Sequence, residues 1–151
     1  MSEEKHRVVQ SFKAALADAH HSAQSEWDEL KASLTKETKS TAGDKHETGR
    51  AMVHLEMEQA GQRLARMDSM RSTMMRLDLD SVRNTVGPGA LVLVQGGGFL
   101  LGVPFGGFNV PGLGKIQAIS SDAPLASAMR GKASGDEVSF REKTWHLLKV
   151  V

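Results

Sequence analysis

The N-terminal half of the chain carries two stripes of apolar residues at helical spacing. The members of the first stripe are Val9, Phe12, Leu16, Ala19, Ala23, Trp27, Leu30 and Leu34. The members of the second stripe are Val53, Met57, Ala60, Leu64, Met67, Met70, Met74 and Leu77. Residues three or four apart lie on one face of an α-helix, so the pattern predicts two long amphipathic helices.

Two helices with one apolar face each can pack against each other as an antiparallel hairpin. With 1.5 Å of rise per residue, arms of about 30 to 35 residues would make a rod of roughly 45 to 50 Å. A homodimeric coiled coil could bury the same methionine-rich face. We therefore expect a monomer, with a dimer as the alternative.

The C-terminal half has short β-branched runs punctuated by glycine and proline. All four prolines and twelve of the fifteen glycines follow residue 86. Runs such as 90–94 and 115–119 predict strands. The predicted protein is therefore α+β, with an antiparallel helical hairpin (coiled coil) over 1–84, a linker at 85–89 and a β-rich domain over 90–151.

A polar segment between the two stripes, residues 37–50, predicts the turn of the hairpin. It contains two carboxylates three positions apart, Asp44 and Glu47. Asp44 fits a helix N-cap, with Glu47 in the reciprocal capping position. The same spacing also places two hard oxygen ligands on one side of a helix, where they suit Mg²⁺. A capping box and a metal-binding pair are both consistent with the pattern.

Composition narrows the possible classes of function. Nineteen basic and eighteen acidic residues give a net charge of +1, which provides no single-sign field for nonspecific nucleic-acid or membrane binding. The absence of cysteine excludes disulfides, thiol nucleophiles and cysteine-ligated zinc. The longest apolar run, 90–94, is too short to span a bilayer. We therefore expect a cytoplasmic protein with no membrane partner.

Two motifs together resemble the Gre transcript cleavage factors, the GreA/GreB-like transcription elongation factors. The segment Gly43-Asp44-Lys45-His46-Glu47 is similar to that family's Gly-Asp-Leu-Ser-Glu-Asn tip, with the aspartate and glutamate in register. Residues 119–138 are similar to the family's C-terminal signature, a Ser-Pro helix start, a Gly-Lys turn and Val-Gly-Asp-Glu-Val. Both motifs occur in the family order, so the resemblance covers essentially the whole chain.

The resemblance implies an accessory factor of bacterial RNA polymerase that is not itself an enzyme. In the family a coiled coil enters the polymerase secondary channel, while an FKBP-like antiparallel β-sheet domain with one short helix docks on the channel rim. The docking loop corresponds to Asp122, Ala123 and Pro124. The tip acids, Asp44 and Glu47, would help to hold a second Mg²⁺ shared with the polymerase active site, near the 3′ end of the nascent RNA. The polymerase would then cleave backtracked RNA, and the free factor would not bind the metal stably.

The chain departs from the family pattern at both motifs. Lys45 and His46 replace leucine and serine, and Thr48, Gly49 and Arg50 follow the glutamate. A nearby cation competes with a metal for carboxylates, so a noncatalytic channel regulator or inhibitor is the alternative function. At the docking loop alanine replaces the usual serine, and without a partner this segment would be a plain helix start.

The C-terminal half carries further local predictions. Ser121 is expected to cap a short helix, and Lys143 to Val151 to form one last strand. The glycine run at 95–99 predicts a hairpin turn, because no Lys-Ser/Thr follows it as in a phosphate loop. Phe105 and Phe108 would either close a small core or form an exposed contact surface. A prolyl isomerase is disfavoured, because the chain has few aromatic residues to line a pocket.

Overall fold

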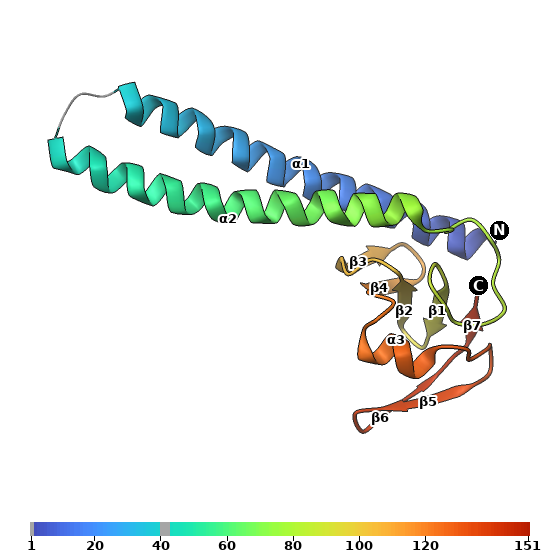
Figure 1. The fold of residues 1–151 in the computed structure, drawn as a ribbon. Coiled ribbons are helices and arrows are strands. Elements are labelled where there is room, and N and C mark those ends of the chain that lie inside the picture. Colours follow the sequence, from blue (N-terminus) through green and yellow to red (C-terminus); the bar gives the residue numbers. More distant parts are fainter. Residues whose placement is uncertain (1, 40–42) are drawn as a thin grey trace. The chain divides into compact units, whose positions relative to one another are not determined.

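The computed structural model describes residues 2–39 and 43–151 (Figure 1). Side chains are described for all of these residues except 37–39 and 43–48. Two long helices come first, α1 (Glu3–Lys39) and α2 (Gly43–Arg76). The β-rich part follows, with β1 (Leu91–Val94), β2 (Gly97–Leu101), β3 (Gly106–Val110), β4 (Gly114–Ile119), α3 (Pro124–Met129), β5 (Glu137–Phe140), β6 (Lys143–His146) and β7 (Lys149–Val150). The predicted α+β class is confirmed.

The chain divides by its contacts into two compact units. The first unit comprises Met1–Ala15 and Met70–Val151, and the second comprises Leu16–Ser69. The predicted division at 85–89 follows the change from helix to strand. The contacts instead group the N-terminal part of α1 and the C-terminal end of α2 with the sheet.

In the second unit, segments of α1 and α2 pack antiparallel. His20 Nε2 and Asp68 Oδ1 are 2.7 Å apart, and Glu26 forms an ion pair with Arg63. Later residues of α1 therefore pair with earlier residues of α2, as antiparallel packing requires. Ala60, a member of the second apolar stripe, is fully buried. The predicted helical hairpin is confirmed in this unit.

Both helices extend into the segment predicted as a turn. Because α1 continues to Lys39 and α2 begins at Gly43, most of residues 37–50 is helical. Asp44 accordingly lies inside α2, and the prediction that it is the N-cap was wrong. The segment contains no proline, and a glycine costs a helix only about 1 kcal/mol, so its polar composition did not prevent either helix from extending into it.

The first unit contains a five-stranded sheet, in the order β3-β4-β2-β1-β7, and a separate two-stranded ribbon, β5-β6. Neighbouring strands are antiparallel except for β2 and β4, which are parallel. The hairpin between β1 and β2 turns at residues 95–96, as predicted.

The single last strand predicted for Lys143 to Val151 is two strands in the structure. β6 pairs with β5, whereas β7 pairs with β1. Between them the backbone N–H of Leu147 donates to the carbonyl of Asp136, and that of Leu148 donates to the carbonyl of Leu93. The chain therefore crosses from the ribbon to the sheet at these two residues, which alternating hydrophobicity alone does not reveal.

Both faces of the five-stranded sheet are covered. One face belongs to a core cluster with α3 and β5, which contains Val86, Val92, Val94, Phe99, Leu101, Ala126, Met129, Val138, Leu147 and Val150. On the other face the ring of Phe12, from α1, lies 5.8 Å from that of Phe105 and 5.6 Å from that of Phe108. Phe105 and Phe108 therefore help to close a core, which was the first of the two alternatives given for them. Burial on both faces also explains why β1 is apolar at four consecutive positions.

Lys5 is a buried charged residue on α1. Its Nζ donates a 2.7 Å hydrogen bond to the backbone carbonyl of Ser81, in the segment that follows α2. Burial lowers the pKa of Lys5, and the charge of Arg83 lowers it further, while Asp78 and Asp80 act in the opposite direction. The folded protein therefore binds this proton less tightly than the unfolded chain does.

This difference predicts a pH dependence of stability. At pH values between the lowered pKa and the ordinary value of 10.5, the unfolded chain binds more protons than the folded protein does. Raising the pH within this range therefore favours the folded state. We expect the free energy of unfolding of the native protein to rise, relative to that of Lys5→Met, as the pH increases from neutral toward this value. Urea unfolding of both proteins at several pH values measures the difference. A difference that is constant or falls with pH would contradict the prediction.

Candidate functional site

The two carboxylates that the sequence singles out, Asp44 and Glu47, belong to the first turns of α2. Their side chains lie outside the described residues, so their role stays a prediction. Positions three apart in a helix share a face, and a helix N-terminus favours negative charge, so the backbone suits two carboxylates that act on one cation. Among the residues whose side chains are described, no group of three or more histidines and acids is arranged to hold a metal.

The second predicted site is the segment that leads into α3. Asp122 and Pro124 are exposed, whereas Ala123 is partly buried against the core cluster. The backbone N–H of Asp122 donates to Ser120 Oγ at 3.2 Å, and that of Ala123 donates to the Ser120 carbonyl at 3.1 Å. These bonds fix the loop and leave two of its three candidate residues available to a partner. The site lies in the first unit, while the two α2 carboxylates lie in the second.

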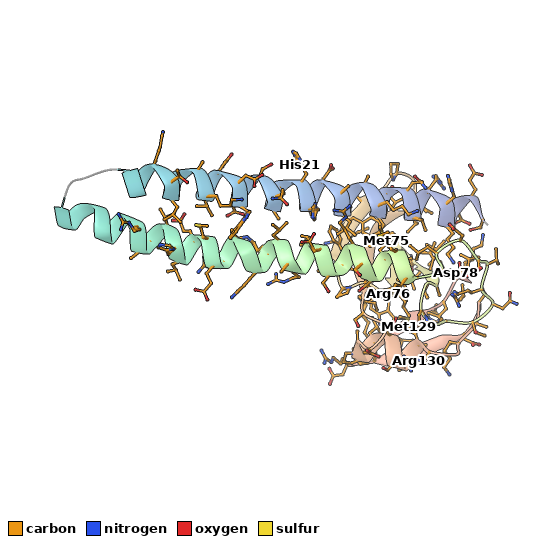
Figure 2. All side chains as sticks on the ribbon, turned by 45° about the horizontal axis from the view of Figure 1, so that its top comes forward. His21, Met75, Arg76, Asp78, Met129 and Arg130 are labelled. Carbon is orange, nitrogen blue, oxygen red and sulfur yellow. The ribbon has the colours of Figure 1, made fainter. Side chains whose placement is uncertain are left out.

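The cap of α3 differs from the prediction. The N-cap is Ala123 and not Ser121, and no side chain caps the helix. Pro124 occupies the first helical position, which its fixed φ angle suits, and so sets the start of the helix three residues after Ser121. Ser121 instead accepts a 3.1 Å hydrogen bond at its carbonyl from the guanidinium of Arg130, which follows Met129 at the other end of α3 (Figure 2).

The uncapped start of α3 leads to a stability prediction. Ala123 has φ −59° and ψ 144°, the extended conformation that a capping residue adopts. Ala123→Ser should therefore let a hydroxyl accept a free N–H of the first turn and stabilise the protein by about 0.5 to 2 kcal/mol. Urea denaturation measures the change, and Ser127→Ala, on the exposed side of the same helix, provides the control. A destabilised Ala123→Ser protein would contradict this account of the helix start.

The sequence reasoning missed a turn that begins at Asp78, two residues after the end of α2 at Arg76 (Figure 2). Asp78 Oδ1 accepts backbone hydrogen bonds from Asp80 at 3.2 Å and Ser81 at 3.0 Å. The hydrogen bonds from the Ser81 hydroxyl and backbone lower the pKa of Asp78. A Cβ on Gly89, which has φ +87°, would collide with the carbonyl of Asp78. An Asp with Ser three residues later is typical of such a side-chain-stabilised turn, and this signal was in the sequence.

Comparison with known proteins adds little to these observations. No protein-family model matches the chain, and no curated protein matches it. One similar solved structure is described as "Structure of the transcription factor Gfh1", with 15% identical residues, 87% of this chain and 92% of that chain covered, and a TM-score of 0.32. A TM-score this low does not establish a common fold. No helix within the described ranges is both long and apolar enough to cross a membrane.

Proposed function

We propose that this chain is a bacterial transcription elongation factor of the Gre type. It would bind RNA polymerase through the secondary channel and present Asp44 and Glu47 to the polymerase active site. The observation that carries the proposal is the position of the two family-like motifs. Residues 43–47 open the second helix of the hairpin, and residues 119–138 contain the loop and short helix that follow β4.

The two acids are proposed to contribute oxygen ligands to a cation that the polymerase also holds. Carboxylate oxygens are the ligands that Mg²⁺ prefers, and two of them leave most of its octahedral positions to water and other groups. When bound, a second Mg²⁺ would stabilise the attacking and leaving oxygens of a phosphodiester displacement. Asp44 and Glu47 would bind and orient the ion, and the polymerase would carry out hydrolysis of the nascent RNA near its 3′ end.

The loop before α3 is proposed as the contact with the rim of the channel. The exposure of Asp122 and Pro124 supports this role, since both can reach a partner without unfolding of the loop. Ala123 has no hydroxyl to offer and is partly buried. The contact would therefore depend on the Asp122 carboxylate and the Pro124 ring.

Retention of core RNA polymerase by the immobilised full-length chain at low salt tests the proposal. We expect the native chain to retain the polymerase and Asp122→Lys to weaken binding roughly tenfold, because a reversed charge at a rim contact is repulsive. Glu142→Lys makes the same charge change at an exposed position in the β5-β6 turn and should have no effect. If the native chain fails to bind at low salt, channel binding and tip function are both contradicted.

A further inference from the structure

The β1-β2 turn is bordered by three adjoining hollows in the first unit. Their volumes are about 470, 180 and 360 Å³. Val94 lines all three, Gly96 lines the first and second, and Trp145 lines the second and third. The second and third hollows share Val94, Gln95 and Trp145, and we call these two hollows together the turn groove. The first hollow contains Leu93 and Lys149, which alternate with Val94 and Val150 of the core cluster and so belong to the other side of the sheet.

The charges that line the turn groove are predominantly basic. Lys115 lines the second hollow and Lys143 the third. Among the described residues no carboxylate lines these two hollows, and the carboxylate of Glu4 in the first hollow is paired with Lys149, whose Nζ lies 2.6 Å from its Oε1. Lys115 and Lys143 are therefore the lining cations whose charge no carboxylate of the groove offsets. A ligand with carboxylates would complement them.

The groove also offers an apolar contact and a strand edge. Leu148 lines the first and third hollows, and 62% of its surface is exposed. In the described part of the chain, β6 has a neighbouring strand, β5, on one side only. An exposed strand edge beside an apolar side chain is a typical binding place for an extended peptide.

The packing of Trp145 favours a peptide over a single-stranded nucleic acid. Its ring packs edge to face on Phe99, with centroids 5.1 Å apart, and Lys143 Nζ lies 4.0 Å from its centroid. A base would need an open ring face to stack on, and the Phe99 ring and the Lys143 ammonium group already lie next to the Trp145 ring. Lys143 is exposed, so its ammonium group remains available to a carboxylate at the same time.

We propose that the turn groove binds an extended, acidic segment of a partner protein. Carboxylates of this segment would pair with Lys115 and Lys143, and an apolar side chain would pack on Leu148. The groove does not include the Asp122–Pro124 loop, and this inference does not depend on the proposed transcriptional function.

Fluorescence anisotropy of the full chain with a labelled peptide of alternating glutamate and leucine tests the proposal. We expect this peptide to bind, with an affinity that falls as salt is added. The double variant Lys115→Gln, Lys143→Gln should weaken binding roughly tenfold. Lys132→Gln removes an exposed lysine outside the groove and should leave the affinity unchanged. All three positions are exposed, so the variants should fold normally.

A second readout locates the peptide on the chain. In a Trp27→Phe background the remaining tryptophan is Trp145, and its emission should change when the acidic peptide binds. The proposal would be overturned if a glutamine-leucine peptide bound equally well, or if the double variant bound like the native chain. Binding of a single-stranded RNA with the same dependence on Lys115 and Lys143 would also overturn it, and would identify a nucleic-acid site instead.

Discussion

Replacement of both Asp44 and Glu47 by alanine is expected to slow RNA shortening in stalled polymerase complexes by roughly 10- to 100-fold, to a rate near that of the polymerase alone. The reason is the loss of two oxygen ligands from a cation site that the chain is proposed to complete. Binding to the polymerase should persist, because the proposed docking loop lies elsewhere. Gel analysis of RNA length over time, with binding measured in parallel, provides the test.

A magnesium titration makes this test specific. The native chain should lower the Mg²⁺ concentration needed for half-maximal cleavage, whereas the double variant should not. Glu58→Ala removes an exposed acid further along α2 and should behave like the native chain. If the double variant binds and cleavage is unchanged, the metal role of the two acids is wrong. If the native chain binds without any stimulation, the alternative of a noncatalytic regulator is correct.

Phe12→Ala is expected to destabilise the first unit by about 3 to 5 kcal/mol. Phe12 is fully buried and packs against Phe105 and Phe108 on the sheet, so its removal leaves a cavity that the two strand-side rings cannot fill. Urea unfolding followed by circular dichroism measures the loss. Such a cost would be a large fraction of the stability of a small domain.

Two further variants distinguish the effect of the cavity on stability from an effect of the substitution on the helix. Lys13→Ala alters the next residue of α1, which is exposed, and should change stability by no more than about 0.5 kcal/mol. Phe12→Leu retains most of the apolar volume and should cost less than the alanine substitution. A Phe12→Ala protein as stable as the native chain would show that α1 does not pack on this sheet in solution.

The sequence was informative where periodicity was long and regular. The two apolar stripes predicted both helices and their antiparallel pairing, and the glycine run predicted the β1-β2 turn. Periodicity shows that one face of a helix is buried without showing what covers it. Phe12 belongs to the first stripe, yet it packs on the sheet, and so the contact between the start of α1 and the β-rich part was not predicted.

Other features depended on contacts between residues far apart in the chain. Nothing near Lys5 in the sequence indicates that it is buried, because its hydrogen-bond acceptor belongs to Ser81. The split of the last strand depends on bonds to β1 and to Asp136. Of the candidate site residues, Asp122 and Pro124 lie on the surface as a docking loop requires. The roles of Asp44 and Glu47 stay predictions that rest on the motif.

The position of the hairpin tip in a polymerase complex tests the central claim most directly. The chain contains no cysteine, so Ala42→Cys provides a single attachment point for an iron chelate that cleaves nearby chains by hydroxyl radicals. In stalled complexes this probe is predicted to cut the nascent RNA near its 3′ end and the polymerase near its active centre. The same probe at Ser127→Cys, on the exposed side of α3, should cut the channel rim and spare the RNA. If the Ala42 probe cuts neither the RNA end nor the active centre in complexes that contain the factor, the proposed insertion of the hairpin is contradicted.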